Sequence, residues 1–182
     1  RISEAGTRLA ALRAGDVDII SVLYEHVPEL EARGFKILPI RSVKAVHVAF
    51  GGMNTPGSEH YDANVPWVGP TEERARTVRR AMAVAVDRQT IIDTIYAGQG
   101  ENVAVPGFIP GRPWTDPTVQ PYPYDPAQAR ELLAQAGYPD GFPVKILSLA
   151  PFYGGAEIPL VAEAVANYWT RVGLDVEIIP ME

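Results

Sequence analysis

The sequence contains no cysteine, only three lysines and no long hydrophobic run. The absence of cysteine excludes thiolate zinc sites, thiol nucleophiles and disulfide bonds, and it leaves the redox compartment undetermined. No stretch approaches the roughly 20 consecutive apolar residues that a membrane-spanning helix needs. With 16 basic against 22 acidic residues, the formal net charge of −6 argues against a nucleic-acid-binding surface.

What the sequence does contain is the composition of a globular domain, with 47% hydrophobic and 21% charged residues. A length of 182 residues suits one domain with a substantial core. The sequence starts at Arg1, without a methionine or a signal peptide and close to a predicted helix. We therefore expect a piece of a longer protein, in which a missing targeting signal carries no weight.

The most sharply delimited element is a predicted helix at residues 126–136. Asp125 can act as its N-cap, Pro126 suits the first helical position, and Gln128 has the spacing of a capping box. Gly137 can adopt the left-handed turn that ends the helix. An apolar stripe comprises Ala129, Leu132, Leu133 and Ala136. Because this helix has no residue that could perform chemistry, we expect it to be structural.

Helix and strand signals alternate along the rest of the chain. Further helices are predicted at Glu4–Ala14, at Pro28–Gly34, after an N-cap at Thr71, at Arg88–Ala97 after an N-cap at Asp87, and along a stripe formed by Ile158, Val161, Val165, Tyr168 and Val172. Strands are predicted at Asp16–Val22, Ala45–Gly52, Pro143–Ala150 and Leu174–Pro180. This alternation favours an α/β fold with helices on the faces of a sheet. Residues 53–70 and 99–124 are predicted to be long loops, which are often functional.

Catalytic signatures are scarce. There is no phosphate-binding loop and no nucleophile elbow, and the segment GQGENV at residues 98–103 lacks the third glycine of a dinucleotide loop. Glu59, His60 and Asp62 could form a carboxylate–imidazole–carboxylate cluster, although a solvated loop is the favoured interpretation. An enzyme acting through His60 and Asp62 is therefore the weakest hypothesis, and we expect no catalytic residue, no metal and no cofactor.

Two places could contact a ligand. In PFYGGAE, residues 151–157, Phe152 and Tyr153 lie between the carboxyl end of a predicted strand and a helix N-terminus, where α/β proteins bind ligands. The alternative is that both rings close over the core. On the predicted strand at residues 45–50, His47 shares a face with Ala45 and Ala49. That face is either a cleft wall or a solvated surface.

Four blocks of sequence, in order, resemble one protein family. They are RLAALRAGDVDI (residues 8–19), VRRAMAVAVDRQTIIDTIYAGQG (78–100), YDPAQARELLAQAGYPDGFP (124–143) and VAEAVANYWTRVGLDVEIIPME (161–182). They resemble the family 5 extracellular solute-binding proteins, the peptide-, nickel- and oligosaccharide-type receptors of ABC importers. The most specific parts are the A-x-D-R step at Ala85–Arg88 and the Y-D-P…A-G-Y block. One departure is Phe50–Gly51, where the family usually has Phe-Asn.

The resemblance implies a type II periplasmic-binding-protein fold, in which two hinged lobes close on a solute. Residues 1–182 would form a single α/β lobe, the second, with a mixed sheet flanked by helices. It further implies that this lobe contacts solute from three places. The residues so implied are Ser21, Val22 and Tyr24, then His47 and Ala49, then Phe152, Tyr153 and Glu157.

The expected function is thus half of a hinged clamp for peptides or similar small solutes. The implied partners are that solute, the other lobe of the same receptor and the permease subunits of an ABC importer, with no nucleic acid. The implied location of the full-length protein is extracytoplasmic, either periplasmic or as a membrane-anchored lipoprotein. The alternative is a solute-sensing regulatory domain with the same fold.

Overall fold

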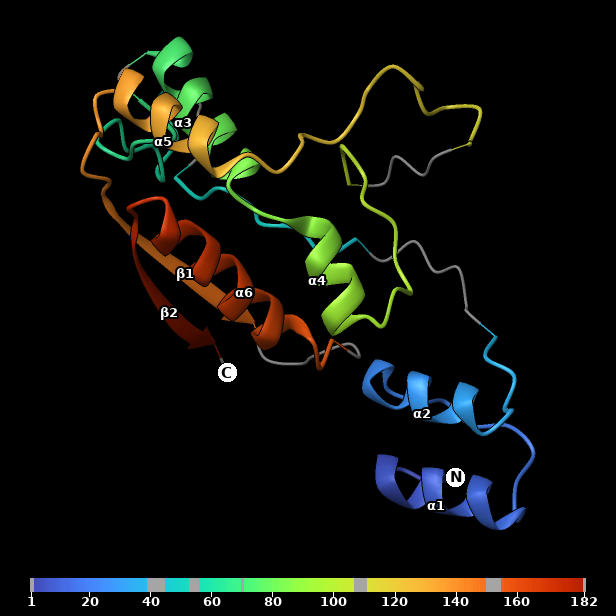
Figure 1. Ribbon diagram of the computed structural model, residues 1–182. Helices are drawn as coiled ribbons and strands as arrows, with labels where there is room; N and C mark the ends of the chain where they lie inside the picture. Colours follow the sequence, from blue (N-terminus) through green and yellow to red (C-terminus); the bar gives the residue numbers. More distant parts are fainter. Residues whose placement is uncertain are drawn as a thin grey trace. The chain divides into compact units, whose positions relative to one another are not determined.

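The computed structural model describes residues 2–38, 45–52, 56–69, 71–106, 111–149 and 155–181. Its elements, in chain order, are α1 (Ala5–Ala14), the 3-10 helix η1 (Tyr24–His26), α2 (Val27–Ala32), α3 (Glu72–Val84), α4 (Arg88–Ile95), α5 (Pro126–Gln135), β1 (Pro143–Leu149), α6 (Ile158–Arg171) and β2 (Asp175–Met181) (Figure 1). The chain divides into two compact units, residues 1–42 with 92–101 and residues 43–91 with 102–182.

The first unit pairs two short helices, α1 and α2, which lie side by side (Figure 1). The Glu4 carboxylate caps α1, accepting hydrogen bonds from the backbone N–H groups of Gly6 and Thr7. Arg13 of α1 forms an ion pair with Glu29 of α2 at 2.5 Å. The buried side chains described in these two helices are Leu9, Val27 and Leu30. Both predicted helices are confirmed here to within a few residues.

The predicted strand at Asp16–Val22 is wrong. These residues form no strand, and the Ile19 side chain is 82% exposed. A β-branched run becomes a strand only where a neighbouring strand supplies ladder hydrogen bonds. Among the described residues, no strand pairs with this segment.

In the second unit, α3 and α5 pack together as a helical layer (Figure 1). The Thr71 hydroxyl caps α3 by accepting from the Arg74 N–H at 3.3 Å, as predicted. The predicted α3 stripe is buried, and it consists of Ala75, Val78, Met82 and Ala85. These small and medium side chains let the two helices approach closely.

The start of α5 follows the prediction except for the capping box. Asp125 Oδ1 accepts from the Gln128 N–H at 2.8 Å, which is the expected N-cap bond. The reciprocal bond of the box is replaced, because the Asp125 N–H donates to the Val84 carbonyl at 2.8 Å. The backbone at the start of α5 is therefore tied directly to the end of α3.

The strands β1 and β2 form a two-stranded parallel sheet, in which Val144 pairs with Val176 and Leu149 with Met181. Helix α6 connects the two strands and covers one face of the sheet (Figure 1). On that face Val144 and Ser148 are buried, whereas Lys145 and Leu147 on the other face are exposed. Both strands confirm the sequence prediction.

The buried stripe of α6 is shifted relative to the prediction. Val165 and Val172 are buried as expected, but Ile158, Val161 and Tyr168 are only half-buried. The other buried side chains of this helix are Ala162, Ala166 and Trp169. The Trp169 indole N–H donates to the Met82 carbonyl of α3 at 2.9 Å. A buried tryptophan that satisfies its one donor thus links α6 to the helical layer.

Residues 45–52 form no strand either, which corrects the second β prediction. Both faces of the expected alternation are open to solvent: Val46 is 42% and Val48 44% exposed, and His47 and Ala49 are also exposed. Alternation in the sequence therefore does not bury one face here, since the described residues supply no partner strand.

Candidate functional site

The first predicted contact segment, Ser21–Tyr24, follows the exposed stretch after α1. Ser21 is exposed, and its carbonyl accepts from the Arg8 Nε at 3.2 Å, which holds the backbone. Val22 is half-buried. Tyr24 begins η1, and its ring lies edge-on to that of Tyr96, with 5.2 Å between centroids. One edge of the tyrosine is thus engaged within its own unit.

The second predicted segment presents His47 and Ala49 to solvent. His47 Nδ1 lies 3.4 Å from the Ala45 carbonyl, a local contact that leaves the ring on the surface. An exposed imidazole is available to a binding partner as well as to water. Exposure agrees with a rim position, and contact with a solute stays a prediction.

The third predicted segment is described only in part. Phe152 and Tyr153 lie outside the described residues. Glu157 is half-buried at the N-cap position of α6, where its side chain makes no capping hydrogen bond. In the second unit, His47 thus presents an exposed polar side chain, and the Glu157 side chain is not used as a helix cap.

The exposed segment at residues 45–52 is fixed at its carboxyl end by aromatic contacts. Phe50 lies 5.9 Å from Trp67, and Trp67 lies 6.1 Å from Phe142, measured between ring centroids. Phe142 in turn lies 4.9 Å from Tyr138, over whose ring the Arg74 guanidinium stacks at 4.8 Å. We name Phe50, Trp67, Phe142 and Tyr138 the aromatic row. It joins the segment to the helical layer of α3 and α5.

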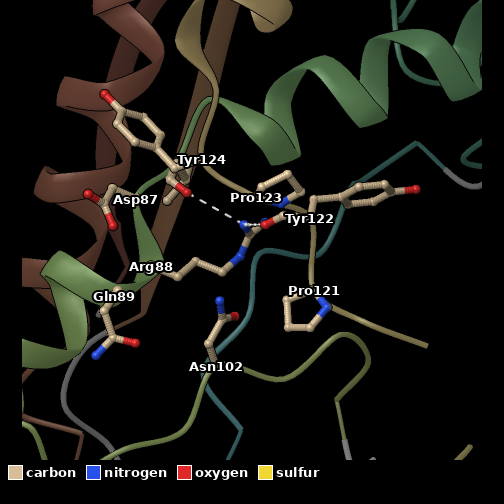
Figure 2. Close-up of a pocket in the computed structure, with 9 residues that line it drawn as sticks. Asp87, Arg88, Gln89, Asn102, Pro121, Tyr122, Pro123 and Tyr124 are labelled. Carbon is tan, nitrogen blue, oxygen red and sulfur yellow. Dashed lines mark hydrogen bonds between the residues drawn. The ribbon is translucent and has the colours of Figure 1, made fainter. Parts of the chain in front are cut away.

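A cavity of about 300 Å³ opens beside the start of α4 (Figure 2). Its lining residues are Val86, Asp87, Arg88, Gln89, Asn102, Pro121, Tyr122, Pro123 and Tyr124. The Arg88 guanidinium donates to the carbonyls of Ala83 at 2.9 Å, Tyr122 at 3.4 Å and Val86 at 3.5 Å. Burial lowers the pKa of Arg88 from its ordinary value.

This cavity is where the two most specific sequence blocks meet. Arg88 of the A-x-D-R step binds carbonyls at the end of α3 and in the approach to α5. Together with the bond from Asp125 to Val84, it makes a joint between segments that are 34 residues or more apart in sequence. The arrangement gives these motif residues an architectural role.

A second cluster stabilises the other side of the same joint. Asp87 caps α4 as predicted, accepting from the Thr90 N–H at 3.0 Å and from the Thr90 hydroxyl at 2.8 Å. Burial, and secondarily the Asp87 carboxylate, raise the pKa of Tyr168. The Tyr168 ring lies edge-on to Tyr124, with 5.6 Å between centroids. Sequence reasoning identified Asp87 but gave no role to Tyr168 beyond the stripe.

The Glu59–Asp62 segment has the geometry of a solvated loop. Asp62 Oδ1 accepts from the Asn64 backbone N–H at 2.8 Å and from its side chain at 3.0 Å, and Glu59 and His60 are exposed. Within the part of the chain that the structure describes, no group of three or more histidines and carboxylates could hold a metal ion. None of the helices in that part is long and apolar enough to cross a membrane.

Residues 1–182 match the family model for bacterial extracellular solute-binding proteins, family 5 Middle. The chain is 30% identical over 176 residues to heme-binding protein A of Haemophilus influenzae, covering 95% of this chain and 29% of that protein. It is 37% identical over 108 residues to di/tripeptide-binding protein 1 of Pseudomonas aeruginosa, covering 58% of this chain and 20% of that protein.

Among solved structures, the chain is similar to the periplasmic binding protein DppA of Helicobacter pylori, determined with the peptide STSA. The TM-score is 0.57 at 28% identity, covering 100% of this chain and 31% of that one. The chain thus spans less than a third of the length of these relatives. The expected type II periplasmic-binding-protein fold is confirmed. The chain belongs to the bacterial extracellular solute-binding proteins of family 5.

Proposed function

We propose that the chain is part of the solute receptor of an ABC importer and forms one side of a hinged clamp. The observation that carries the proposal is the match of the entire chain to the family model, together with 30% identity over 95% of the chain to a solute-binding relative. Such a clamp binds its solute between two halves, and the bound solute shifts the population from the open to the closed form. Catalysis plays no part in this function.

The solute that we propose is a short peptide. Two observations support this class: the relative named for di- and tripeptides is 37% identical over 108 residues, and the similar DppA structure holds the peptide STSA. The relative named for heme covers more of the chain at a lower identity of 30%, so heme is the competing solute. Both can be titrated in the same experiment.

We further propose that residues 1–182 belong to a single lobe, the second, of a longer extracytoplasmic protein that works with permease subunits. The length of the relatives supports this proposal, since the chain covers only 29% of heme-binding protein A. An isolated chain would then supply only part of the solute contacts. We expect it to bind solute far more weakly than the longer protein.

Within this lobe, the proposed solute contacts are the eight residues predicted above. For the described ones, support comes from position: Ser21, His47 and Ala49 are exposed, and Glu157 starts α6 without capping it. His47 and Ala49 are the best placed of them, because the aromatic row fixes the neighbouring backbone. Binding walls that are held in place before the solute arrives bind with a smaller ordering cost.

The deciding experiment is native mass spectrometry of the full-length protein that carries this sequence, followed by calorimetric titration after its bound solute is removed. The titrants are the dipeptide Ala-Ala, reduced glutathione and haemin. Saturable binding of Ala-Ala, or of glutathione, which is a tripeptide, supports the proposal, whereas binding of haemin alone would replace peptide by heme. Binding of none of the three, in a polypeptide joined to a DNA-binding segment, would favour the regulatory alternative.

Variants of His47 test the site itself. His47→Ala in the full-length protein should weaken solute binding while leaving the melting temperature unchanged, because the exposed ring makes only a local contact. His60→Ala is the matched control, since His60 is also exposed but lies in the solvated loop. A loss of stability without a loss of affinity would make His47 a packing residue.

A further inference from the structure

The backbone of the predicted solute-facing segment is held by one indole group. The Trp67 Nε1 donates to the Gly51 carbonyl at 2.8 Å, across 16 positions in sequence. Its ring also packs against Phe50, 5.9 Å between centroids. Two consecutive residues, immediately after Ala49, are thus held by the same side chain.

Trp67 is itself anchored to α3. The Arg79 guanidinium donates to the Trp67 carbonyl at 2.7 Å and to the Glu72 carboxylate at 2.6 Å. Arg79 is only partly exposed, so its bond to a backbone carbonyl is shielded from water. The chain of contacts therefore runs from a regular helix, through Arg79 and Trp67, to the Gly51 carbonyl.

The backbone conformation next to this anchor requires glycine. Gly52 has φ of +91°, a conformation that side-chain-bearing residues rarely adopt, and an added Cβ would approach Val68 to 3.2 Å. The segment is consequently held at Gly51, and the residue that follows needs glycine. Residues 45–49, by contrast, are exposed and take part in no strand among the described residues.

We propose that Trp67 is a positioning residue for solute binding: its indole N–H, bonded to the Gly51 carbonyl, holds the segment that carries His47 and Ala49 in place before the solute arrives. This inference rests on the proposed function for its link to solute. The hydrogen bond from the Trp67 indole to the Gly51 carbonyl, which we call the tether, does not depend on that function. An untethered segment would have to be ordered at the moment of binding, which lowers affinity.

The first measurement tests the tether by ¹⁵N relaxation in the full-length protein. Trp67→Phe keeps an aromatic ring and removes the donor, and benzothienylalanine at position 67 removes the donor with the shape almost unchanged. In both variants, the backbone order parameters at Ala49 and Gly51 should fall from the rigid range, about 0.85, to about 0.6. Trp114→Phe is the control, since Trp114 is 63% exposed. Unchanged order parameters would overturn the tether.

The second measurement tests the consequence for solute, using whichever of Ala-Ala, reduced glutathione or haemin the unmodified protein binds. Losing one hydrogen bond that orders the segment should weaken binding about fivefold, with a smaller change for Trp114→Phe. If His47→Ala weakens binding and the Trp67 variants do not, the positioning role is wrong while the proposed function stands. If neither substitution changes affinity, the segment is not a solute contact. If no titrant binds, the proposed peptide solute is wrong, and the order parameters still decide the tether.

Discussion

Strand β1 and the segment at residues 45–52 share an alternation of apolar residues but have different structures. Both alternate branched apolar residues with others, yet Val144 of β1 is 3% exposed and Val48 is 44% exposed. β1 has a parallel partner in β2 and a covering helix in α6, whereas the segment has neither among the described residues. The difference shows that an alternating sequence is compatible with a β-strand, but that the strand forms only where a partner strand is available.

The largest expected effect comes from the residue that joins the covering helix to the helical layer. Trp169→Ala should lower the free energy of unfolding by about 3–5 kcal/mol, because it opens a large cavity and removes the donor to the Met82 carbonyl. Urea denaturation followed by circular dichroism measures it. Trp114→Ala is the control and should stay within about 0.5 kcal/mol, as Trp114 is exposed. Equal effects of the two variants would contradict the burial argument.

The role of burial can be tested by introducing threonine at one buried and one exposed position. Val144→Thr puts a hydroxyl under α6 and should cost about 1–3 kcal/mol of unfolding free energy. Ile19→Thr, in the other segment wrongly predicted as a strand, should change it by less than about 0.5 kcal/mol. The same urea titration serves both variants. A large loss for Ile19→Thr would show that residues 16–22 are buried after all.

Helix caps should give an intermediate effect. Asp87→Ala removes the acceptor for the Thr90 N–H and hydroxyl and should cost about 1 kcal/mol. Because the Asp87 carboxylate contributes to the raised pKa of Tyr168, that pKa should also fall in the variant. Thermal melting and an ultraviolet titration of tyrosine report the two changes. An unchanged melting temperature would count against the cap.

The smallest effect is expected at the start of α1, on the surface of the first unit. Hydrogen bonds from the Thr7 side chain and from the backbone N–H groups of Gly6 and Thr7 lower the pKa of Glu4 to about 2. The folded-state pKa lies below the ordinary value of 4.5, so the cap contributes fully above pH 4.5 and is lost as the pH falls toward about 2. An NMR titration of the Glu4 carboxylate should show this pKa. In Glu4→Gln, the chemical shift of the Thr7 amide should no longer change over this pH range. A Glu4 carboxylate that titrates near 4.5 would disprove the cap.

Helices could be predicted well because their signals are local. Thr71, Asp87 and Asp125 each cap the helix that immediately follows, and every one makes the expected bond to the chain three residues on. Gly15 and Gly137 both adopt the left-handed conformation past a helix end. All of these interactions lie within one turn of chain, so no knowledge of the fold is needed.

The predictions that were wrong concern features that depend on contacts between residues far apart in sequence. The Asp125 N–H pairs with Val84 instead of with Gln128, and the stripe of α6 turns toward Trp169 because Met82 supplies an acceptor 87 positions away. The buried stripe also includes Ala162 and Ala166, which are only weakly hydrophobic and therefore do not stand out in a hydrophobicity pattern. For the site, sequence placed His47 at the surface correctly, but it offered no signal for the hydrogen bond between Trp67 and Gly51.

The joint made by Arg88 has a practical consequence for engineering. Its bond to the Tyr122 carbonyl, and the bond from the Asp125 N–H to the Val84 carbonyl, hold the carboxyl end of the loop at residues 99–124. Gly111, inside that loop, has nothing within 4 Å of an added Cβ. Since doubling the length of a loop costs only about 0.6 kcal/mol, we expect a foreign peptide tag or a dye-binding insert beside Gly111 to be tolerated. The position suits a reporter group, because the described contacts that hold α3 and α5 together do not involve the residues next to Gly111.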